Sequence, residues 1–470
     1  MRAAPKVTAG LAAFVRDTRL AQIPEEVLGK ASKAIVDAFG AILCGAASEV
    51  APPLLRYLGT SHAQGDAIVL GTHLKTTAEL AALLNGSFGA ALEYDDVYSA
   101  MPGHPAAIMV PALCTEASRG AVEGARVLEA FVVGYEAGAK LALGVGMGHY
   151  QRRGFHATGT LAMFCALAAL ARLRKLNLEQ IETAFGIASS MAGGLRCQFG
   201  TMMKPFHSGW AARCAVAAVD LAESGFTAAM DAIENEDGGF IAAYGTEDSD
   251  PAAALTTLGN PWSLIDPGFA LKKFPSCYAG HRPMDGLLTL KRELDLTAGN
   301  VDRITCHVPP GSLRPMRYPD PKTGLEAKFS VPYALAAGVL DGRYSLWTFT
   351  DEAVLRPAIK PLLSKVVALE DERCMGAGQA HRSWGSRGFV EIEARTTAGK
   401  QATVQVEFAP GHPQRALTWD DLHEKFIDCA QYAGIAKTSA ETLYERLRDL
   451  RACVDLTPLL DSMRTPARAP

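Results

Sequence analysis

The chain has 470 residues, of which 49% are hydrophobic and 20% charged, and its formal net charge is -4 at pH 7. This length and composition predict a globular protein of two or three domains with a large core. The slightly acidic balance argues against a nucleic-acid-binding protein, which would carry a basic excess or stripe. The N-terminal segment lacks the apolar stretch of a signal peptide, and the uncharged runs fall short of the roughly 18 to 20 residues that span a bilayer. We therefore expect a cytoplasmic protein with no nucleic-acid partner and no membrane contact.

The cysteines and the short motifs bear on cofactors. The 10 cysteines are scattered and include no C-x-x-C pair, which is typical of core residues in a reducing compartment. The sequence also lacks a P-loop, an H-E-x-x-H motif and the glycine fingerprint of dinucleotide-binding folds. We therefore expect no metal and no cofactor, so that any chemistry comes from side chains alone.

The first half of the chain shows the 3.6-residue apolar period of helices joined by short glycine-rich connections. The most apolar of these helices is predicted over 161–171, with Thr158 and Thr160 as its caps and His156 just before its start. Because a helix start offers free N–H groups and a partial positive charge, this position suits an anionic ligand. The alternative is that His156 only caps the helix or satisfies a buried polar contact.

The composition changes after residue 267. A helix is predicted over 282–294, and the alternating segment 301–308 predicts a strand. Two further alternating segments, 388–395 and 401–408, lie on either side of a short polar turn and predict a hairpin.

These segments predict the domain organisation. We interpret 1–267 as an all-helical domain, 268–408 as a separate α+β unit, and 409–470 as helices that return to pack on the first domain. The expected fold class is therefore mainly α, with a large helical domain and a smaller α+β domain.

Four clusters place ionisable side chains at helix ends or in loops instead of along apolar faces. The clusters consist of Glu93, Asp95, Asp96 and His104; Tyr150 and His156; Lys204 and His207; and Lys272, Lys273, Cys277 and His281. In the first cluster, an acid could orient a histidine base, although adjacent carboxylates are also common in solvated turns. In the third, Lys204 precedes a proline and is predicted on an extended link, from which its ammonium reaches inward unless it is simply exposed.

The fourth cluster lies at the proposed domain boundary and would direct cations into an interdomain cleft. Together the clusters set several cations against two or three carboxylates, which predicts a small anionic ligand with more than one carboxylate or phosphate. Cys277 lies close to Lys272 and His281, which could make its thiol reactive, but such cysteines usually only pack.

In this order the clusters resemble the MmgE/PrpD family. The resemblance is carried by the stretches 92–96 with 104–105, 154–160, 200–205, 272–275 with 281–282, and 327–333. The family includes 2-methylcitrate dehydratase, cis-aconitate decarboxylase and iminodisuccinate epimerase, which act on small polycarboxylates without a metal. The resemblance implies a homodimer, a helical domain with a smaller lid domain, and no cofactor. It further implies that the active site is lined by His104, His156, Lys204, Lys272 and Tyr318, with Asp95 and Asp96 nearby.

The chain departs from each of these enzymes. The decarboxylase-like pattern has aspartate, threonine and histidine where this chain has Glu93, Val97 and Cys277. The Asp-Asp-Thr-His of the dehydratases corresponds here to Asp-Asp-Val-Tyr at 95–98. Tyr150 ahead of 154–160 is closer to the epimerase, in which a tyrosine and a lysine are the proposed acid and base.

We therefore expect a cofactor-independent enzyme that removes or delivers a proton beside a carboxylate of a small di- or tricarboxylate. Lys204, Lys272 and His156 would hold the carboxylate, and His104, oriented by Asp95 or Asp96, would be the acid or base. Tyr150 would serve the opposite face, and further substrate contacts are predicted for Lys273, His281 and Tyr318. The leading function is a lyase of the 2-methylcitrate dehydratase type. The alternatives are an epimerase, a cis-aconitate-type decarboxylase, and a non-catalytic dimer that binds a metabolite.

Overall fold

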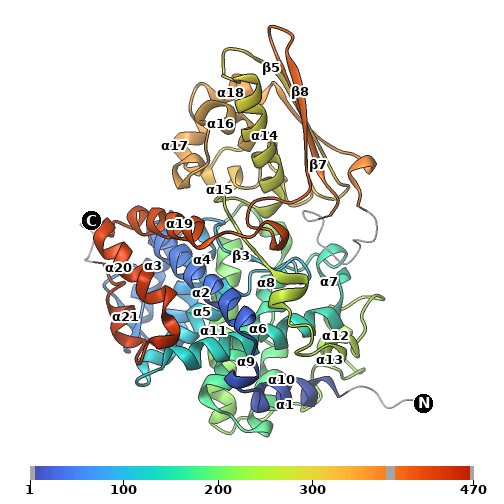
Figure 1. The fold of residues 1–470 in the computed structure, drawn as a ribbon. Helices are drawn as coiled ribbons and strands as arrows, with labels where there is room; N and C mark the ends of the chain where they lie inside the picture. The colour runs from blue at the N-terminus through green and yellow to red at the C-terminus, as the bar shows by residue number, and fades with distance from the viewer. Residues whose placement is uncertain (1–5, 377–386, 466–470) are drawn as a thin grey trace.

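The structure is a computed structural model that describes residues 6–376 and 387–465. The chain forms a large helical body and a smaller α+β domain, which lies above the body in Figure 1. Helices dominate, so the predicted fold class is confirmed.

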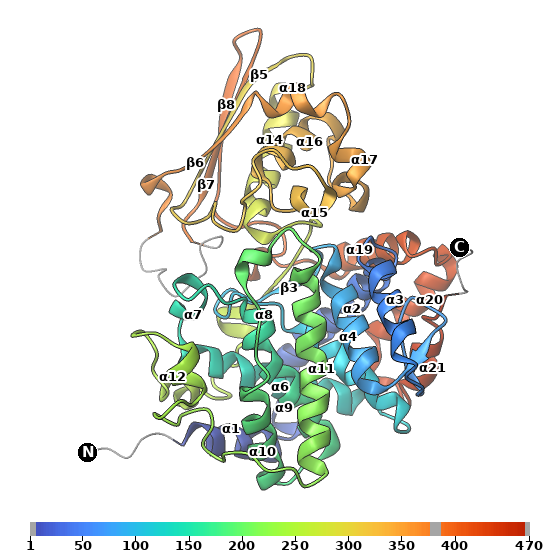
Figure 2. The same cartoon turned by 180° about the vertical axis from the view of Figure 1, so that it is seen from behind.

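The body consists of helices that pack around one continuous apolar core. Its longer helices are α1 (Val7–Asp17), α2 (Glu25–Gly45), α3 (Ala51–Ser61), α4 (Ala78–Ala91), α5 (Ala106–Cys114), α6 (Gly124–Val145), α9 (Ala162–Arg174), α10 (Leu178–Ser189) and α11 (Met203–Glu223). The short helices α7 (Gly148–Gln151), α8 (Ala157–Thr160), α12 (Phe240–Tyr244) and α13 (Ala253–Thr256) lie between them. The chain returns to the body in α19 (Trp419–Tyr432), α20 (Lys437–Arg448) and α21 (Thr457–Asp461), which lie beside α2 and α3 (Figures 1 and 2).

Helix α9 is the buried helix predicted from the sequence, and nearly all of its side chains lie in the core against α6. Residues 157–174 are apolar enough to cross a membrane by length and composition, but 89% of that stretch is buried within the protein, which accounts for its composition. The prediction that Thr158 and Thr160 cap this helix is wrong. The N-cap positions of α8 and α9 are His156 and Leu161, and the Thr160 hydroxyl instead lies 2.7 Å from His149 Nε2.

The smaller domain is built on one four-stranded sheet. Its strands are β5 (Val301–Val308), β6 (Val366–Glu370), β7 (Val390–Thr396) and β8 (Gln401–Val406), in the order β6-β5-β7-β8. Strands β5, β7 and β8 pair antiparallel, whereas β6 pairs parallel to β5. The strand over 301–308 and the hairpin are confirmed, and β6 was not predicted.

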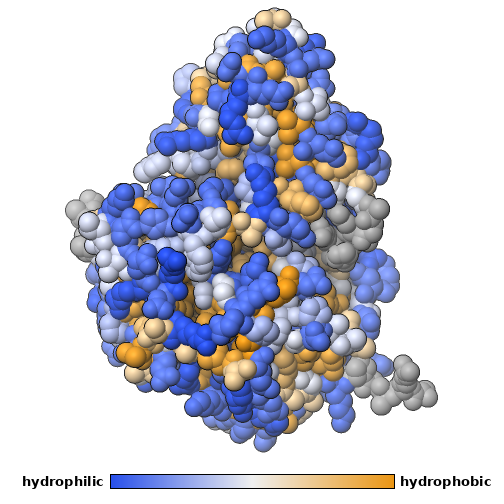
Figure 3. Space-filling model, in the orientation of Figure 1, coloured by the Kyte–Doolittle hydropathy of each residue, from blue (hydrophilic) through white to orange (hydrophobic). Residues whose placement is uncertain are grey.

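Helices cover one face of this sheet (Figures 1 and 2). The two long helices are α14 (His281–Leu294) and α16 (Val331–Asp341). The domain also contains the short helices α15 (Gly324–Ala327), α17 (Asp351–Val354) and α18 (Ile359–Leu363). Gly286 lets α14 approach the sheet closely, because a Cβ atom there would lie 2.3 Å from the Ile392 side chain. The face of the molecule that Figure 3 shows is largely hydrophilic over both domains, with hydrophobic residues in small groups.

The two domains are joined by segments that run side by side. The entering segment contains β4 (Ala270–Leu271), which pairs antiparallel with β3 (Asp96–Val97) of the body, and Asp96 faces Leu271 in this ladder. The Leu271 amide donates to the carbonyl of Gly411 in the returning segment at 3.0 Å. Strands β3 and β4 therefore fix the start of the smaller domain against the loop that carries residues 93–104.

Candidate active site

A small pocket, with about 60 Å³ of space for water-sized molecules, opens where the two domains meet. The body contributes Glu93, Val97, Pro102, His104, Tyr150, His156, Phe199 and Lys204, and the segments of the smaller domain contribute Cys277, Tyr278, Ala279, Pro315 and Phe329. Side chains from all four predicted clusters thus line one cavity, although the fourth cluster contributes only Cys277, and Lys272 lies directly behind the lining.

Helix packing brings the first and third clusters together. Helices α4 and α11 run antiparallel and cross closely at two glycines, since a Cβ atom on Gly86 would lie 2.8 Å from Gly209 Cα. Glu93 follows the end of α4 and Lys204 lies in the first turn of α11, which reaches the junction with the smaller domain (Figure 2). Glu93 adopts a left-handed φ of 54°, a strained conformation for a residue other than glycine, which is common at functional sites.

The prediction that Lys204 lies on an extended link is wrong, because α11 already begins at Met203. Pro205 fits this first turn since an amide there has no partner within the helix. The helix therefore holds both Lys204 and His207 rigidly, one turn apart.

Two lysines and two carboxylates form a buried ion-pair cluster. Lys204 Nζ contacts Glu93 Oε1, and Lys272 Nζ lies 3.0 Å from Glu93 Oε2 and 2.8 Å from Asp95 Oδ1. Burial opposes charge on Lys272, but the attraction of Asp95 and Glu93 outweighs it and raises the pKa of Lys272. The positive neighbours likewise outweigh burial and lower the pKa of Glu93 and of Asp95, so the cluster is charged and nearly neutral in sum.

His104 is held as a neutral imidazole. Its Nδ1 lies 2.5 Å from the Asp96 carbonyl oxygen, which only accepts, so Nδ1 carries the proton, and it also lies 3.2 Å from Asp95 Oδ2. Burial lowers the pKa of His104 to about 4, although Asp95 acts in the opposite direction. The ring lines the pocket with Nε2 unprotonated, which suits a general base.

The imidazole rings of His156 and His207 contact each other. Their Nδ1 atoms are 3.0 Å apart, and the buried His156 Nε2 has no hydrogen-bond partner among the described residues. Burial, reinforced by Lys204, lowers the pKa of both histidines, that of His207 to about 4. His156 therefore presents an unsatisfied ring nitrogen in the wall of the pocket, which a ligand would satisfy. His207 was noted in the sequence without a role, and its position one helical turn after Lys204 was the available signal.

An aromatic wall faces these polar groups. Tyr150, Phe199 and Phe329 pack together, and the Arg196 guanidinium lies 4.8 Å from the centre of the Tyr150 ring. Burial raises the pKa of Tyr150, so its hydroxyl stays protonated and able to donate. Tyr318 lies behind the pocket lining, where its hydroxyl donates to the Phe199 carbonyl at 2.9 Å and so supports the wall. Phe199 and Phe329 were missed, although each lies in or beside a stretch that carries the family resemblance.

Besides Lys272 and Tyr318, which lie behind the lining, three more predicted residues direct their functional groups away from the pocket. Lys273 Nζ lies 2.9 Å from Asp421 Oδ1 of α19. His281 is buried at the start of α14, with Nε2 3.2 Å from the Ser276 carbonyl, and burial lowers its pKa to about 3. Asp96 Oδ1 accepts hydrogen bonds from the Ala106 and Ala107 amides at 3.1 and 3.4 Å, so it caps α5.

Two further predictions concern Cys277 and metal binding. Cys277 lines the pocket, but burial raises the pKa of its thiol to about 11, so the unreactive protonated form prevails. Ligand atoms of Glu93, Asp95 and His104 lie within 4.8 Å of one another, a spacing that a metal ion could use. Lys272 already bridges both of these carboxylates, so a metal would have to displace an ammonium group, and this donor set fits lysine pairing better.

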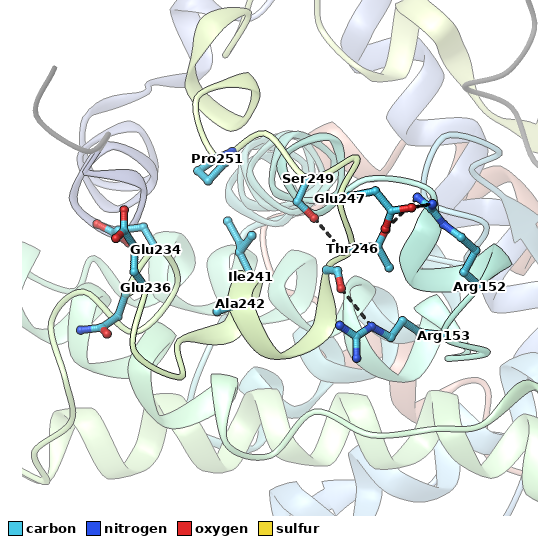
Figure 4. A pocket seen from close by; sticks show the side chains of 12 residues that line it. Arg152, Arg153, Glu234, Glu236, Ile241, Ala242, Thr246, Glu247, Ser249 and Pro251 are labelled. Atoms are coloured by element: carbon cyan, nitrogen blue, oxygen red, sulfur yellow. Dashed lines mark hydrogen bonds and ion pairs between the residues drawn. The ribbon is translucent and has the colours of Figure 1, made fainter. Parts of the chain in front are cut away.

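A second hollow lies on the outer side of the body (Figure 4). It is larger, about 680 Å³ counted in the same way, but its arginines are already paired. Arg152 lies 2.8 Å from Asp248, and Arg153 donates to the Gly245 carbonyl at 3.1 Å. These groups are largely solvated, so the chemistry is assigned to the pocket between the domains.

The fold and the pocket define a mainly α, two-domain protein with a pocket of ionisable side chains at the domain junction. Residues 9–252 match the MmgE/PrpD N-terminal domain and residues 274–449 match the MmgE/PrpD C-terminal domain. The chain belongs to the MmgE/PrpD family, as the sequence predicted.

Curated relatives match over nearly the whole chain. The cis-aconitate decarboxylase-like protein oryM of Aspergillus oryzae is 26% identical over 97% of this chain and 96% of its own length. The cis-aconitate decarboxylase of Mus musculus is 25% identical over 97% of this chain and 93% of its own length. That of Homo sapiens is 24% identical over 98% and 95%, respectively.

Proposed function

We propose that this protein is a lyase of the dehydratase type, which removes a proton from the carbon beside a carboxylate and expels a hydroxyl group from the neighbouring carbon. One observation carries this proposal: His104 lines the pocket and is held at Nδ1 by the Asp96 carbonyl, and because burial lowers its pKa to about 4, its Nε2 is unprotonated at neutral pH. A positioned base of this kind contributes about 10² to 10⁴ in rate.

The other pocket groups fit the remaining steps. Negative charge develops on the substrate carboxylate as the proton leaves, and Lys204 and the His156 ring are placed to stabilise it, each donor contributing about 3 kcal/mol. Tyr150 keeps its proton and is the candidate acid for the departing hydroxyl group. Lys272 is enclosed behind Glu93 and Asp95, so we assign it to positioning these carboxylates instead of holding substrate.

Decarboxylation is the second candidate, because the curated relatives that match almost the full chain are named cis-aconitate decarboxylases. The same groups would then protonate the carbon that loses carbon dioxide. Cys277, which stands where the decarboxylase pattern has histidine, argues against this candidate, whereas Val97 departs from both patterns. Epimerisation, in which the proton returns without elimination, uses Tyr150 and Lys204, and both line the pocket.

Proton NMR in heavy water separates these reactions. The protein is incubated with 2-methylcitrate, cis-aconitate, iminodisuccinate and malate, and with their hydroxylated or unsaturated counterparts. Dehydration yields or consumes an alkene with an ultraviolet absorbance, decarboxylation yields a product one carbon shorter, and epimerisation exchanges deuterium alone. Binding without turnover would indicate a metabolite-binding protein, and unchanged turnover in His104→Ala would reject the assignment of the base.

A homodimer remains a proposal that rests on the family resemblance. Light scattering after size-exclusion chromatography tests it, because a dimer has twice the chain mass of 49.9 kDa. A single species at the chain mass would reject it.

A further inference from the structure

Lys425 is a buried lysine that lies outside the pocket lining. It belongs to α19, on the C-terminal return of the chain, and is only 4% exposed. Thr418 caps the start of this helix by accepting from the Asp421 amide at 3.1 Å, and α19 packs against α2. A fixed helix therefore carries an ammonium group into the interior of the protein, where a charge needs partners.

The ammonium group has three partners at hydrogen-bond distance. Nζ lies 2.6 Å from Asp37 Oδ1 of α2, 2.7 Å from the Tyr94 carbonyl oxygen and 2.8 Å from the Lys272 carbonyl oxygen. Since an ammonium group has three donors, these contacts occupy all of them. Burial raises the pKa of Asp37 to about 6, so this carboxylate is charged at pH 7.5 and balances the lysine.

The two carbonyls belong to the chain segments that meet behind the pocket. Tyr94 directly precedes Asp95 in the body, and Lys272 lies in the segment that enters the smaller domain. The side chains of Asp95 and Lys272 pair at 2.8 Å. Lys425 thus joins through the main chain the same two segments that this ion pair joins through side chains.

The β3–β4 ladder alone holds these segments weakly. It has two residues in each strand, and short isolated strand pairs are marginally stable. Lys425 adds two hydrogen bonds from a charged donor, which are roughly twice as strong as neutral ones. Tyr94 adds a further link, because its hydroxyl donates to the Lys273 carbonyl at 3.2 Å and its ring centre lies 4.0 Å from the ammonium group.

The segment that contains Tyr94 also sets the position of His104. Asp95 Oδ2 lies 3.2 Å from His104 Nδ1, and the same Nδ1 donates to the Asp96 carbonyl. A shift of this backbone would move both acceptors and the imidazole with them. A displacement of about 1 Å can cost about 100-fold in rate.

We infer that Lys425 is a positioning residue for His104, the proposed base. Its ammonium group, balanced by Asp37, holds the two carbonyls together and so fixes Asp95 behind the imidazole. The inference rests on the proposed function for the role of His104. It gives the C-terminal helices a part in the reaction, although none of their described residues lines the pocket.

A double variant tests this role. Asp37→Asn with Lys425→Met removes both charges, so neither is left buried without a partner, and methionine keeps a side chain of similar length. On whichever substrate the wild type converts, kcat at pH 7.5 should fall about 10-fold to 100-fold. KM should change less than about threefold, because Lys204 and His156 still bind the substrate. Wild-type kcat, or a loss of kcat/KM that resides in KM, would overturn the inference.

Glu136→Gln with Lys140→Met is the matched control. Lys140 is 2% exposed, and its ammonium group lies 3.5 Å from Glu136 and 3.0 Å from the Pro261 carbonyl, so it also joins a carboxylate to the main chain. Neither residue lines the pocket. The control should keep the wild-type kcat even if its urea midpoint falls as far as that of the test variant. An equal loss of kcat in both variants would show that general loosening of the body lowers the rate, and would overturn the inference.

Hydrogen exchange followed by mass spectrometry tests the positioning without turnover. In the Lys425 double variant, peptides that span 92–98 and 268–274 should exchange faster than in the wild type, and in the control they should not. Unchanged exchange in these peptides would overturn the inference even if kcat fell. If the wild type converts no substrate, the proposed function fails, whereas the exchange result still decides whether Lys425 holds these segments.

A second variant covers the case in which the methionine variant does not fold. In Asp37→Asn with Lys425→Gln, the two amides can hydrogen-bond to each other, but glutamine is one bond shorter than lysine and cannot hold both carbonyls. We expect kcat to fall at least about threefold and the same peptides to exchange faster. Wild-type kcat and exchange in this variant would overturn the inference.

Discussion

Replacement of Lys272 by methionine removes the charge at the centre of the buried cluster while keeping a side chain of similar length. Lys272 is fully buried, and its ammonium lies 3.0 Å from Glu93 Oε2 and 2.8 Å from Asp95 Oδ1. In the variant, Lys204 is the lysine that remains beside two buried carboxylates. Removing one partner of a buried ion pair costs about 3 to 5 kcal/mol, a large share of the about 5 to 15 kcal/mol that stabilises a typical domain.

The pKa values of the two carboxylates predict how the stability difference between wild type and variant depends on pH. Burial raises the pKa of Glu93 and Asp95, but their positive neighbours, Lys272 among them, lower both below the unfolded values. The resulting stabilisation is therefore present above the unfolded pKa of about 4 and is lost as the pH falls below it. Without Lys272 the folded pKa values rise and the carboxylates protonate in the folded state. The difference between wild type and variant should be largest near pH 7.5 and smaller at pH 4.5.

Urea unfolding followed by circular dichroism at both pH values measures this difference. Lys273→Met is the matched control, because its partner Asp421 is partly exposed and such a pair contributes less than about 1 kcal/mol. Adding Asp95→Asn to Lys272→Met should recover about 1 to 3 kcal/mol, because it removes a charge that has lost its partner. A cost below about 1 kcal/mol at pH 7.5, or a larger cost at pH 4.5, would refute the reasoning.

Four further predictions concern the roles of the pocket residues. His104→Gln should lower kcat by about 10² to 10⁴ while the product still binds in calorimetry, and retained kcat would contradict its role as base. In the wild type, kcat/KM should fall only as the pH drops through about 4, because burial lowers the pKa of His104 to about 4; an inflection near the ordinary histidine value of about 6.5 would contradict this. Asp96→Asn should keep activity and change the free energy of unfolding by less than about 1 kcal/mol, since an amide oxygen can accept from the same two amides of α5; a loss of activity would assign Asp96 a chemical role. Dialysis against EDTA should leave activity unchanged, and activity restored by added zinc or magnesium would show that a metal displaces Lys272.

The sequence predicted the elements whose pattern is local. The uninterrupted apolar run of α9 and the polar–apolar alternation of β5, β7 and β8 each show in a few consecutive residues, so both kinds of element could be predicted. Strand β6 (Val366–Glu370) was missed because its five residues do not alternate. It pairs parallel to β5, whose residues lie about 60 positions away, and such pairing leaves no local signal.

The sequence predicted which clusters of residues contribute to the candidate site, but not which side chains in them form ion pairs with one another. Lys272 and Glu93 are 179 residues apart, and nothing in the sequence shows that they pair. Lys272 and Lys273 looked equivalent, but in an extended segment successive side chains point in opposite directions. Lys272 therefore enters the buried cluster, while Lys273 reaches Asp421 on α19.

The short ladder between β3 and β4 explains why the acid–base groups meet at the domain junction. Asp96 faces Leu271 in an antiparallel register, and this places the preceding Asp95 opposite the following Lys272. A shift of one residue would bring Lys273 to that position with its side chain on the other face. The same two-residue ladder starts the segment that enters the smaller domain, so the backbone pairing that positions this domain also positions the ion pair behind His104. A displacement of the smaller domain that breaks β3–β4 would therefore separate Lys272 from Asp95 and remove the support of the base.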